Sequence, residues 1–281
     1  MRSAILQLFA GIILLALVLT GCGGGGGNPI PVATTATGVF VDAPVAGLAY
    51  TSGSQAGVTD ANGQFTYEVG KTIKFMIADI LLGEAPAQAI MTPIHFAASG
   101  SNSSRSEVMT RVQFLMSIST TDPATGKITI PANVSSLFHG KTIDFKTVQE
   151  SELLTLVKLV DPNKTLATAV EAQNHLFESM AKFTVGNYSG TFSGTSTGTW
   201  DIVINNNGAF VGTGAGTETP STPFGINGGL TLDYTLTKIQ FLGSSPNIMW
   251  LGFLDVTTGV LAGSWINVGG RGSGTFTGKK K

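Results

Sequence analysis

The spacing of apolar and polar residues divides the chain into three regions. In residues 38–92, short runs of β-branched and aromatic residues are separated by turn residues, which predicts a small antiparallel β-sandwich. In residues 104–180, apolar residues recur with helical spacing. In residues 183–278, aromatic residues alternate with Gly, Ser and Thr, which is typical of strands joined by tight turns. The pattern predicts a mainly β chain with a helical insert.

The clearest turn of the first region is Asp60-Ala61-Asn62-Gly63. The Asp60 side chain can accept backbone N–H groups, and Asn and Gly tolerate positive φ, so we expect the chain to reverse here between two strands. Alternatively, Asp42, Asp60 and Asn62 could be calcium ligands. The region lacks the dense D-x-D-x-D-G spacing of a calcium loop, which disfavours that alternative.

About three helices are expected in the second region. Apolar residues within 108–116 are spaced i, i+4, i+7 and i+8, and residues 153–160 repeat the pattern. A third helix is expected from residue 165 or 166 to about residue 180. Short strands are expected at 127–130 and 141–145. We expect the helices to pack on the β-sandwich as one lobe.

The third region predicts an eight-stranded antiparallel up-and-down β-barrel. The expected strands are 187–193, 198–205, 209–217, 224–230, 231–242, 247–255, 259–267 and 272–278. The first and last of these strands overlap the segments Gly190–Gly194 and Gly274–Gly278, which nearly repeat each other. Pairing them would close the sheet and remove both exposed edges.

One face of the predicted barrel sheet is aromatic and the other is rich in Thr, Ser and Asn. The alternation is clearest at residues 230–237. A membrane barrel needs an apolar outer belt, so we expect a soluble barrel. An eight-stranded barrel is either filled by side chains or just wide enough for one small ligand. Trp200, Tyr234, Trp250 and Trp265 are the candidate lining residues in either case.

The amino-terminal residues have the organisation of a secretory signal. Arg2 precedes an apolar stretch from Ala4 to Leu19, which is followed by the small residues Thr20-Gly21. The stretch is shorter than the roughly 20 residues of a membrane-spanning helix, which disfavours a retained helix. The sequence Leu19-Thr20-Gly21-Cys22 resembles the lipobox of bacterial lipoproteins. The resemblance implies cleavage before Cys22 and acylation of its side chain.

Cys22 is the only cysteine, so it can form neither an intramolecular disulfide nor a thiolate metal cluster. Acyl chains on this residue would hold the protein on a membrane. Gly23 follows Cys22. Among bacterial lipoproteins, a residue other than aspartate at this position implies transfer to the outer membrane. It does not indicate whether the protein faces the periplasm or the cell surface. The Gly23–Gly27 run and the prolines after it predict a flexible tether with a stiffer end.

Two segments of the first region resemble the transthyretin-like, or carboxypeptidase-regulatory-like, modules of bacterial surface lipoproteins. They are V-D-x-P-V-x-G at Val41–Gly47 and T-D-x-x-G-x-F-x-Y at Thr59–Tyr67. The resemblance implies a non-catalytic β-sandwich. Similar lipoproteins carry an acidic loop after the next helix, where this chain has Thr120–Gly126 with one carboxylate, so no calcium site is implied.

Composition and motifs narrow the function further. A net charge of −1 with only 12% charged residues argues against a nucleic-acid binder. Gly194–Gly198 has the letters of a G-x-S-x-G nucleophile elbow, but it lies between two expected strands instead of a strand and a helix. His95, His139 and His175 lack metal-binding spacing. We expect no enzyme, no metal and no cofactor.

The sequence therefore predicts four segments: a signal peptide at 1–21, a lipidated tether at 22–37, a β-sandwich with helices at 38–181 and a β-barrel at 182–281. The expected function is that of a lipid-anchored, non-catalytic envelope protein in surface adhesion or assembly. Its expected partners are the membrane, through Cys22, and an envelope protein or extracellular polymer. The alternative is a carrier that holds a small apolar ligand or haem in the barrel.

Overall fold

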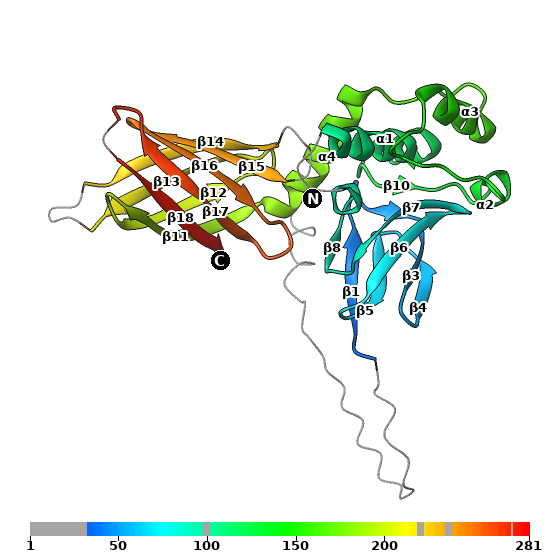
Figure 1. Ribbon diagram of the computed structural model, residues 1–281, viewed down its shortest axis with the longest axis horizontal. Helices are drawn as coiled ribbons and strands as arrows, with labels where there is room; N and C mark the ends of the chain where they lie inside the picture. The colour runs from blue at the N-terminus through cyan, green and yellow to red at the C-terminus, as the bar shows by residue number, and fades with distance from the viewer. Residues whose placement is uncertain (1–32, 98–101, 218–221, 234–237, 271) are drawn as a thin grey trace, which may run out of the picture. The chain divides into compact units, whose positions relative to one another are not determined.

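The computed structural model describes residues 33–97, 102–217, 222–233, 238–270 and 272–281 (Figure 1). The expected signal peptide, the acylation site Cys22 and the candidate lining residue Tyr234 lie outside these residues. Within the described residues, the elements are mainly strands, with four α-helices and one short 3-10 helix. The expected mainly β fold with a helical insert is confirmed.

Two sheets form the β-sandwich. One has the order β5 (Gln64–Glu68), β1 (Thr35–Phe40), β8 (Ile90–Met91), and the other has the order β4 (Gln55–Val58), β3 (Ala49–Ser52), β6 (Thr72–Ile77), β7 (Ile80–Pro86). Aromatic rings fill the space between them, with ring centroids 4.8 Å apart for Phe40 and Phe75 and 5.1 Å apart for Phe65 and Phe75. The expected sandwich arrangement is confirmed.

The turn at residues 60–63 reverses the chain as expected, and Asp60 holds it. Its Oδ1 accepts the backbone N–H groups of Asn62 and Gln64, each at 2.8 Å. Gly63 has a φ of 72°, in the left-handed region that glycine tolerates. The flanking strands do not pair, because β4 pairs with β3 and β5 pairs with β1. The turn therefore carries the chain from one sheet to the other.

Helices follow the sandwich in the chain. They are the 3-10 helix η1 (Pro93–Phe96), α1 (Asn102–Ile118), α2 (Val134–Leu137), α3 (Glu150–Val160) and α4 (Ala169–Thr184). A small third sheet joins β2 (Val45–Ala46), β10 (Ile128–Thr129) and β9 (Thr120–Thr121). No helix of the described residues combines the length and the apolarity that crossing a bilayer requires.

One local expectation for this part of the chain is wrong, and one short helix was not expected. Residues 141–145 do not form a strand, because Asp144 closes a turn there: its Oδ1 accepts the Lys146 N–H at 3.0 Å and its C=O accepts the Val148 N–H at 2.9 Å. The short helix α2 was not expected. The strand expected at 127–130 is present as β10.

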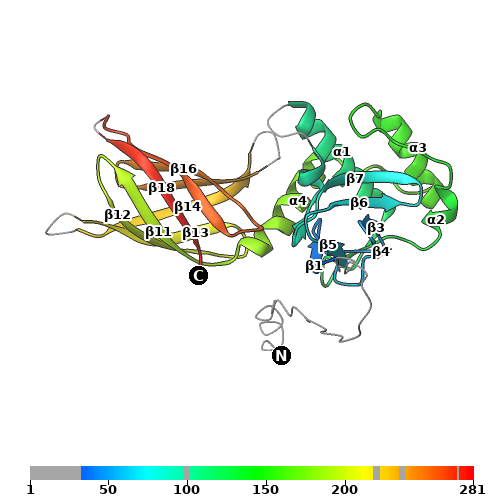
Figure 2. The same cartoon turned by 60° about the horizontal axis from the view of Figure 1, so that its bottom comes forward.

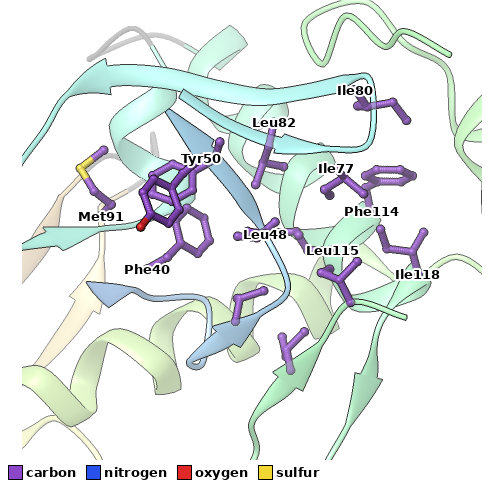
Figure 3. Close-up of a cluster of buried hydrophobic side chains, with 14 of the residues drawn as sticks. Phe40, Leu48, Tyr50, Ile77, Ile80, Leu82, Met91, Phe114, Leu115 and Ile118 are labelled. Atoms are coloured by element: carbon purple, nitrogen blue, oxygen red, sulfur yellow. The ribbon is translucent and has the colours of Figure 1, made fainter. Parts of the chain in front are cut away.

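Helices α1 and α3 share a core with the sandwich. Phe114, Leu115 and Ile118 of α1 lie with buried sandwich residues such as Phe40 and Leu48 in one cluster (Figure 3). Leu153 and Val157 of α3 belong to the same cluster. The expected lobe of sandwich and helices is therefore present for these two helices. The third expected helix differs, because Ala172, Leu176 and Met180 of α4 belong to a second cluster that contains the buried barrel residues.

The carboxyl-terminal strands close into a barrel (Figure 2). They are β11 (Gly186–Gly194), β12 (Gly198–Ile204), β13 (Ala209–Gly216), β14 (Phe224–Leu232), β15 (Ile239–Ser245), β16 (Ile248–Leu254), β17 (Val260–Asn267) and β18 (Ser273–Lys280). Each pairs antiparallel with the next, and β18 pairs with β11. Phe192 opposes Phe276 at this closing seam, and Gly190 opposes Gly278. The expected eight-stranded up-and-down barrel and its closure are confirmed.

The boundary between β14 and β15 differs from the expected one. Strands were expected at 224–230 and 231–242, whereas β14 ends at Leu232 and β15 starts at Ile239. Asp233 ends β14, because its N–H donates to the Lys238 carbonyl oxygen at 3.0 Å and its Oδ1 accepts the Lys238 N–H at 2.8 Å. The alternation of apolar residues, by contrast, continues past Asp233 without a break, so it does not mark this end of the strand.

Candidate functional site

The tryptophans proposed as lining residues lie inside the barrel. Trp200, Trp250 and Trp265 are all buried. Each indole N–H already has an acceptor within the chain at 3.2 Å: the Thr191 carbonyl oxygen for Trp200, Ser245 Oγ for Trp250 and the Ser193 carbonyl oxygen for Trp265. These three donors are therefore used by the barrel itself.

Aromatic rings pack against one another throughout the barrel interior. The Trp250 ring centroid lies 5.3 Å from that of Phe276 and 6.4 Å from that of Trp265, and Phe210 stacks on Phe241 at 4.2 Å. The space lined by Trp200, Trp250 and Phe276 has a volume of about 10 Å³. That is about the space of one water molecule, so an apolar ligand or haem would enter only if the rings moved.

Glycines at fixed positions of the strands make room for these rings. A Cβ atom at Gly278 would lie 2.4 Å from Cζ2 of Trp200, and one at Gly274 would lie 2.6 Å from Nε1 of Trp265. Both separations are too short for non-bonded atoms. The aromatic rings of the barrel interior therefore fit only because glycine stands at these positions of the strands.

Hydroxyl groups lie side by side on part of the outer face of β18, β11 and β12. We call this surface the hydroxyl band, and it consists of Thr191, Ser193, Thr199, Thr275 and Thr277, all exposed. Thr191 stands opposite both Thr199 and Thr277, and Ser193 stands opposite Thr275 with their side-chain oxygens 3.4 Å apart. The expected hydroxyl-rich outer face is present on these strands.

The outer face of β15, β16 and β17 is different. Its large side chains are apolar and between 41% and 53% exposed, and we call them the apolar wall: Leu242, Met249, Leu251, Phe253 and Ile266. Leu251 stands opposite Leu242, and Met249 stands opposite Ile266. The expectation of a Thr, Ser and Asn outer face is wrong for β16.

A signal in the sequence could have revealed the apolar wall. Residues 248–254 read Ile-Met-Trp-Leu-Gly-Phe-Leu, without a polar residue. A strand without alternation has two apolar faces, and only one of them can face the barrel interior. The other face is therefore exposed unless something covers it, and exposed apolar patches often mark interaction sites.

A second unusual group is the buried carboxyl of Asp42. It is fully buried, and neither of its oxygens has a hydrogen-bond partner among the described residues. His175 Nε2 lies 2.9 Å from the Asp42 backbone oxygen and 3.5 Å from Oδ1. Burial raises the pKa of Asp42 to about 6, and the nearby His175 opposes this shift.

The remaining candidate groups have local roles. The histidines have different neighbours, which are Thr92 for His95, Asp79 for His139 and Asp42 for His175. Within the described part of the chain, no three His, Cys, Asp or Glu side chains are placed to hold a metal ion. Residues 194–198 form the connection between β11 and β12, with strands on both sides as expected.

Comparisons with protein-family models, with curated proteins and with solved structures gave no match. The resemblance of residues 41–67 to transthyretin-like modules stays a prediction, as does the lipobox at residues 19–22. The function must therefore be inferred from the chain's own residues.

Proposed function

We propose that this protein is a lipid-anchored, non-catalytic component of the bacterial cell envelope that acts in surface adhesion or assembly. The lipobox at Leu19–Cys22 and the glycine-rich segment after it support anchoring at the outer membrane. The observation that carries the adhesive role is a barrel with a packed interior and a continuous hydroxyl band outside. Its working surface is therefore the outer one.

The hydroxyl band suits a hydrated, hydroxyl-rich polymer as partner. Each hydroxyl can both donate and accept a hydrogen bond, and neighbouring strands repeat these groups about every 4.8 Å. None of the five positions is charged. A single hydrogen bond contributes only about 1 kcal/mol, so useful affinity would come from many contacts along one polymer chain.

Metabolic labelling tests the anchor. Cells that produce the full-length protein are fed an alkyne analogue of palmitate, and the wild type is compared with Cys22→Ser. We expect label and membrane association for the wild type, and neither for the variant. An unlabelled wild type, or a labelled variant, would contradict acylation of Cys22.

Binding to extracellular polysaccharide from the producing cells tests the adhesive role. The triple variant Thr191→Val, Thr199→Val, Thr277→Val removes three hydroxyls and keeps β-branched side chains suited to strands. We expect its binding to fall by about tenfold or more. Thr72→Val, at an exposed threonine of β6 in the sandwich, is the matched control and should bind normally. Equal binding by the triple variant would refute a role for the band.

A further inference from the structure

The apolar wall has no assigned role in the function proposed above. The outward positions of its three strands are Gln240, Leu242, Ser244, Met249, Leu251, Phe253, Val260, Ala262, Ser264 and Ile266, none of which is charged. On the strands of the hydroxyl band, by contrast, the outward positions include Asp201 and Lys279. The barrel therefore has two chemically different sides.

The chemistry of the apolar wall fits the interface of a lipid bilayer. Leu, Met, Ile and Phe side chains favour the boundary between lipid headgroups and acyl chains. Lys238 lies beside the wall, with its Nζ 5.0 Å from the centroid of the Phe253 ring. A lysine in this position can bury its methylene chain and keep its charge near lipid phosphates.

Geometry argues against a second copy of the chain as the occupant. Stable protein interfaces use about 20–30 residues on each side, whereas the wall offers five large apolar side chains. At one end the wall borders a hollow of about 640 Å³, which Phe253 and Lys238 line together with Thr92, Ile94 and His95. The surface is therefore uneven, and two rigid copies would meet over only part of it, whereas a fluid bilayer can adapt to it.

We propose that the apolar wall is a membrane-contact surface, through which the barrel lies against a lipid bilayer. This inference rests on the proposed anchor for its choice of occupant. Residues 23–32 separate Cys22 from Ala33, the first described residue, and can span at most about 35 Å. Anchoring would therefore keep the barrel within reach of a bilayer surface, which makes a lipid bilayer the occupant to test.

Vesicle flotation tests the proposal without the anchor. The protein is residues 22–281 with Cys22→Ser, which retains the whole compact unit from Ala33 to Lys281. The vesicles contain phosphatidylcholine with or without phosphatidylglycerol. We expect the protein to float with the vesicles, and Leu251→Thr, Phe253→Thr to lower the bound fraction by about tenfold or more.

A matched control separates the wall from general surface hydrophobicity. Val203 on β12 and Val211 on β13 are 50% and 65% exposed, more than Leu251 and Phe253 at 46% and 41%, and Val203→Thr, Val211→Thr should float like the parent. Lys238→Gln should weaken flotation only with vesicles that contain phosphatidylglycerol. Circular dichroism and thermal unfolding of each variant establish that the fold is kept.

Three outcomes would overturn the proposal: no flotation of the parent protein, equal flotation of parent and wall variant, or a wall-dependent dimer in sedimentation without flotation. The anchor is read separately, by the labelling of Cys22. Labelled Cys22 without flotation would refute membrane contact through the apolar wall and would still support acylation of Cys22. Flotation that depends on the wall, with unlabelled Cys22, would refute only the anchor.

Discussion

The Asp42 carboxyl is carried into the interior by the backbone around it. The neighbouring residue Ala43 has a φ of 54°, in the left-handed region, and its N–H donates to Ser179 Oγ at 2.8 Å. His175 contacts the Asp42 backbone oxygen from one turn earlier on α4. Two side chains of one helix thus bind the C=O of Asp42 and the N–H of Ala43. These bonds fix the backbone so that the Asp42 carboxyl is buried, although it has no hydrogen-bond partner within the described residues.

Asp42→Asn should remove a pH dependence of stability. Burial raises the pKa of Asp42 from 3.8 to about 6, so the carboxyl favours the folded state when it is protonated. This contribution is complete below pH 3.8 and is lost as the pH rises through 6. As the pH rises from below 3.8 to above 6, the free energy of unfolding of the wild type should fall by about 3 kcal/mol relative to that of the variant.

Urea unfolding at several pH values measures this difference. The free energy of unfolding of the variant should rise relative to that of the wild type as the pH rises from 4 to about 7. Parallel pH profiles for the two proteins would show that Asp42 has an ordinary pKa in the fold.

Gly278→Ala should strain the barrel, because its methyl group would lie 2.4 Å from Cζ2 of Trp200 and 2.3 Å from the Ser189 carbonyl oxygen. Overpacking of this kind typically costs about 1–3 kcal/mol. Gly225→Ala on β14 is the matched control, since no atom lies within 4 Å of its Cβ position. Thermal unfolding followed by tryptophan fluorescence should show a lower Tm for the first variant only. Equal Tm values would contradict the packing role of the glycine.

At the scale of elements, the sequence predicted what local chemistry determines. Turn residues and alternation predicted the number and direction of the barrel strands. The similarity of Gly190–Gly194 to Gly274–Gly278 predicted that the first and last strands pair. The partner of a strand is not local: the turn at residues 60–63 fixes a reversal but not the sheet that β5 joins. Likewise, the apolar alternation around Leu232 continues past the point where Asp233 ends the strand.

Thr168→Ala should destabilise the start of α4. Thr168 Oγ1 accepts the Glu171 N–H at 3.2 Å, and Glu171 Oε2 accepts the Thr168 N–H at 2.8 Å. Loss of such a cap costs about 0.5–2 kcal/mol. This cap also explains why α4 begins at Ala169 and not at residue 165 or 166.

Chemical unfolding measures the loss of the cap. Thr155→Ala is the control, because the Thr155 hydroxyl lies inside α3, bonds the Ser151 carbonyl oxygen and caps no helix end. Its change should be small or stabilising, since Ala favours helices. A Thr168 variant as stable as the wild type would show that the cap contributes nothing.

At the scale of the whole molecule, alternation placed the tryptophans inside the barrel but could not tell whether the barrel is filled. That depends on contacts between strands that are not neighbours in the barrel, such as the stacking of Phe210 on β13 against Phe241 on β15. No local pattern specifies such a contact. The candidate residues were therefore predictable, whereas the volume they leave was not.

Deleting residues 273–281 should open the barrel. Without β18, both β11 and β17 lose their pairing partner, and free strand edges favour aggregation. Size-exclusion chromatography should show a larger aggregated fraction for this deletion than for the wild type. Deleting Lys281 alone removes the bond from its N–H to the Asn187 carbonyl oxygen and the ion pair with Asp201 but keeps all of β18, so the elution profile should stay unchanged. A soluble, monomeric product of the larger deletion would show that the barrel does not need its closing seam.

The closing seam also sets an order of events during synthesis. Ser193 and Thr275, which face each other across it, are 82 residues apart in the chain. Contacts between such distant residues form slowly, and here they must also wait for the last strand to be translated. Strand β11 is the first barrel strand to be made and the last to be paired on both sides, so the growing barrel has an open edge until β18 has been translated.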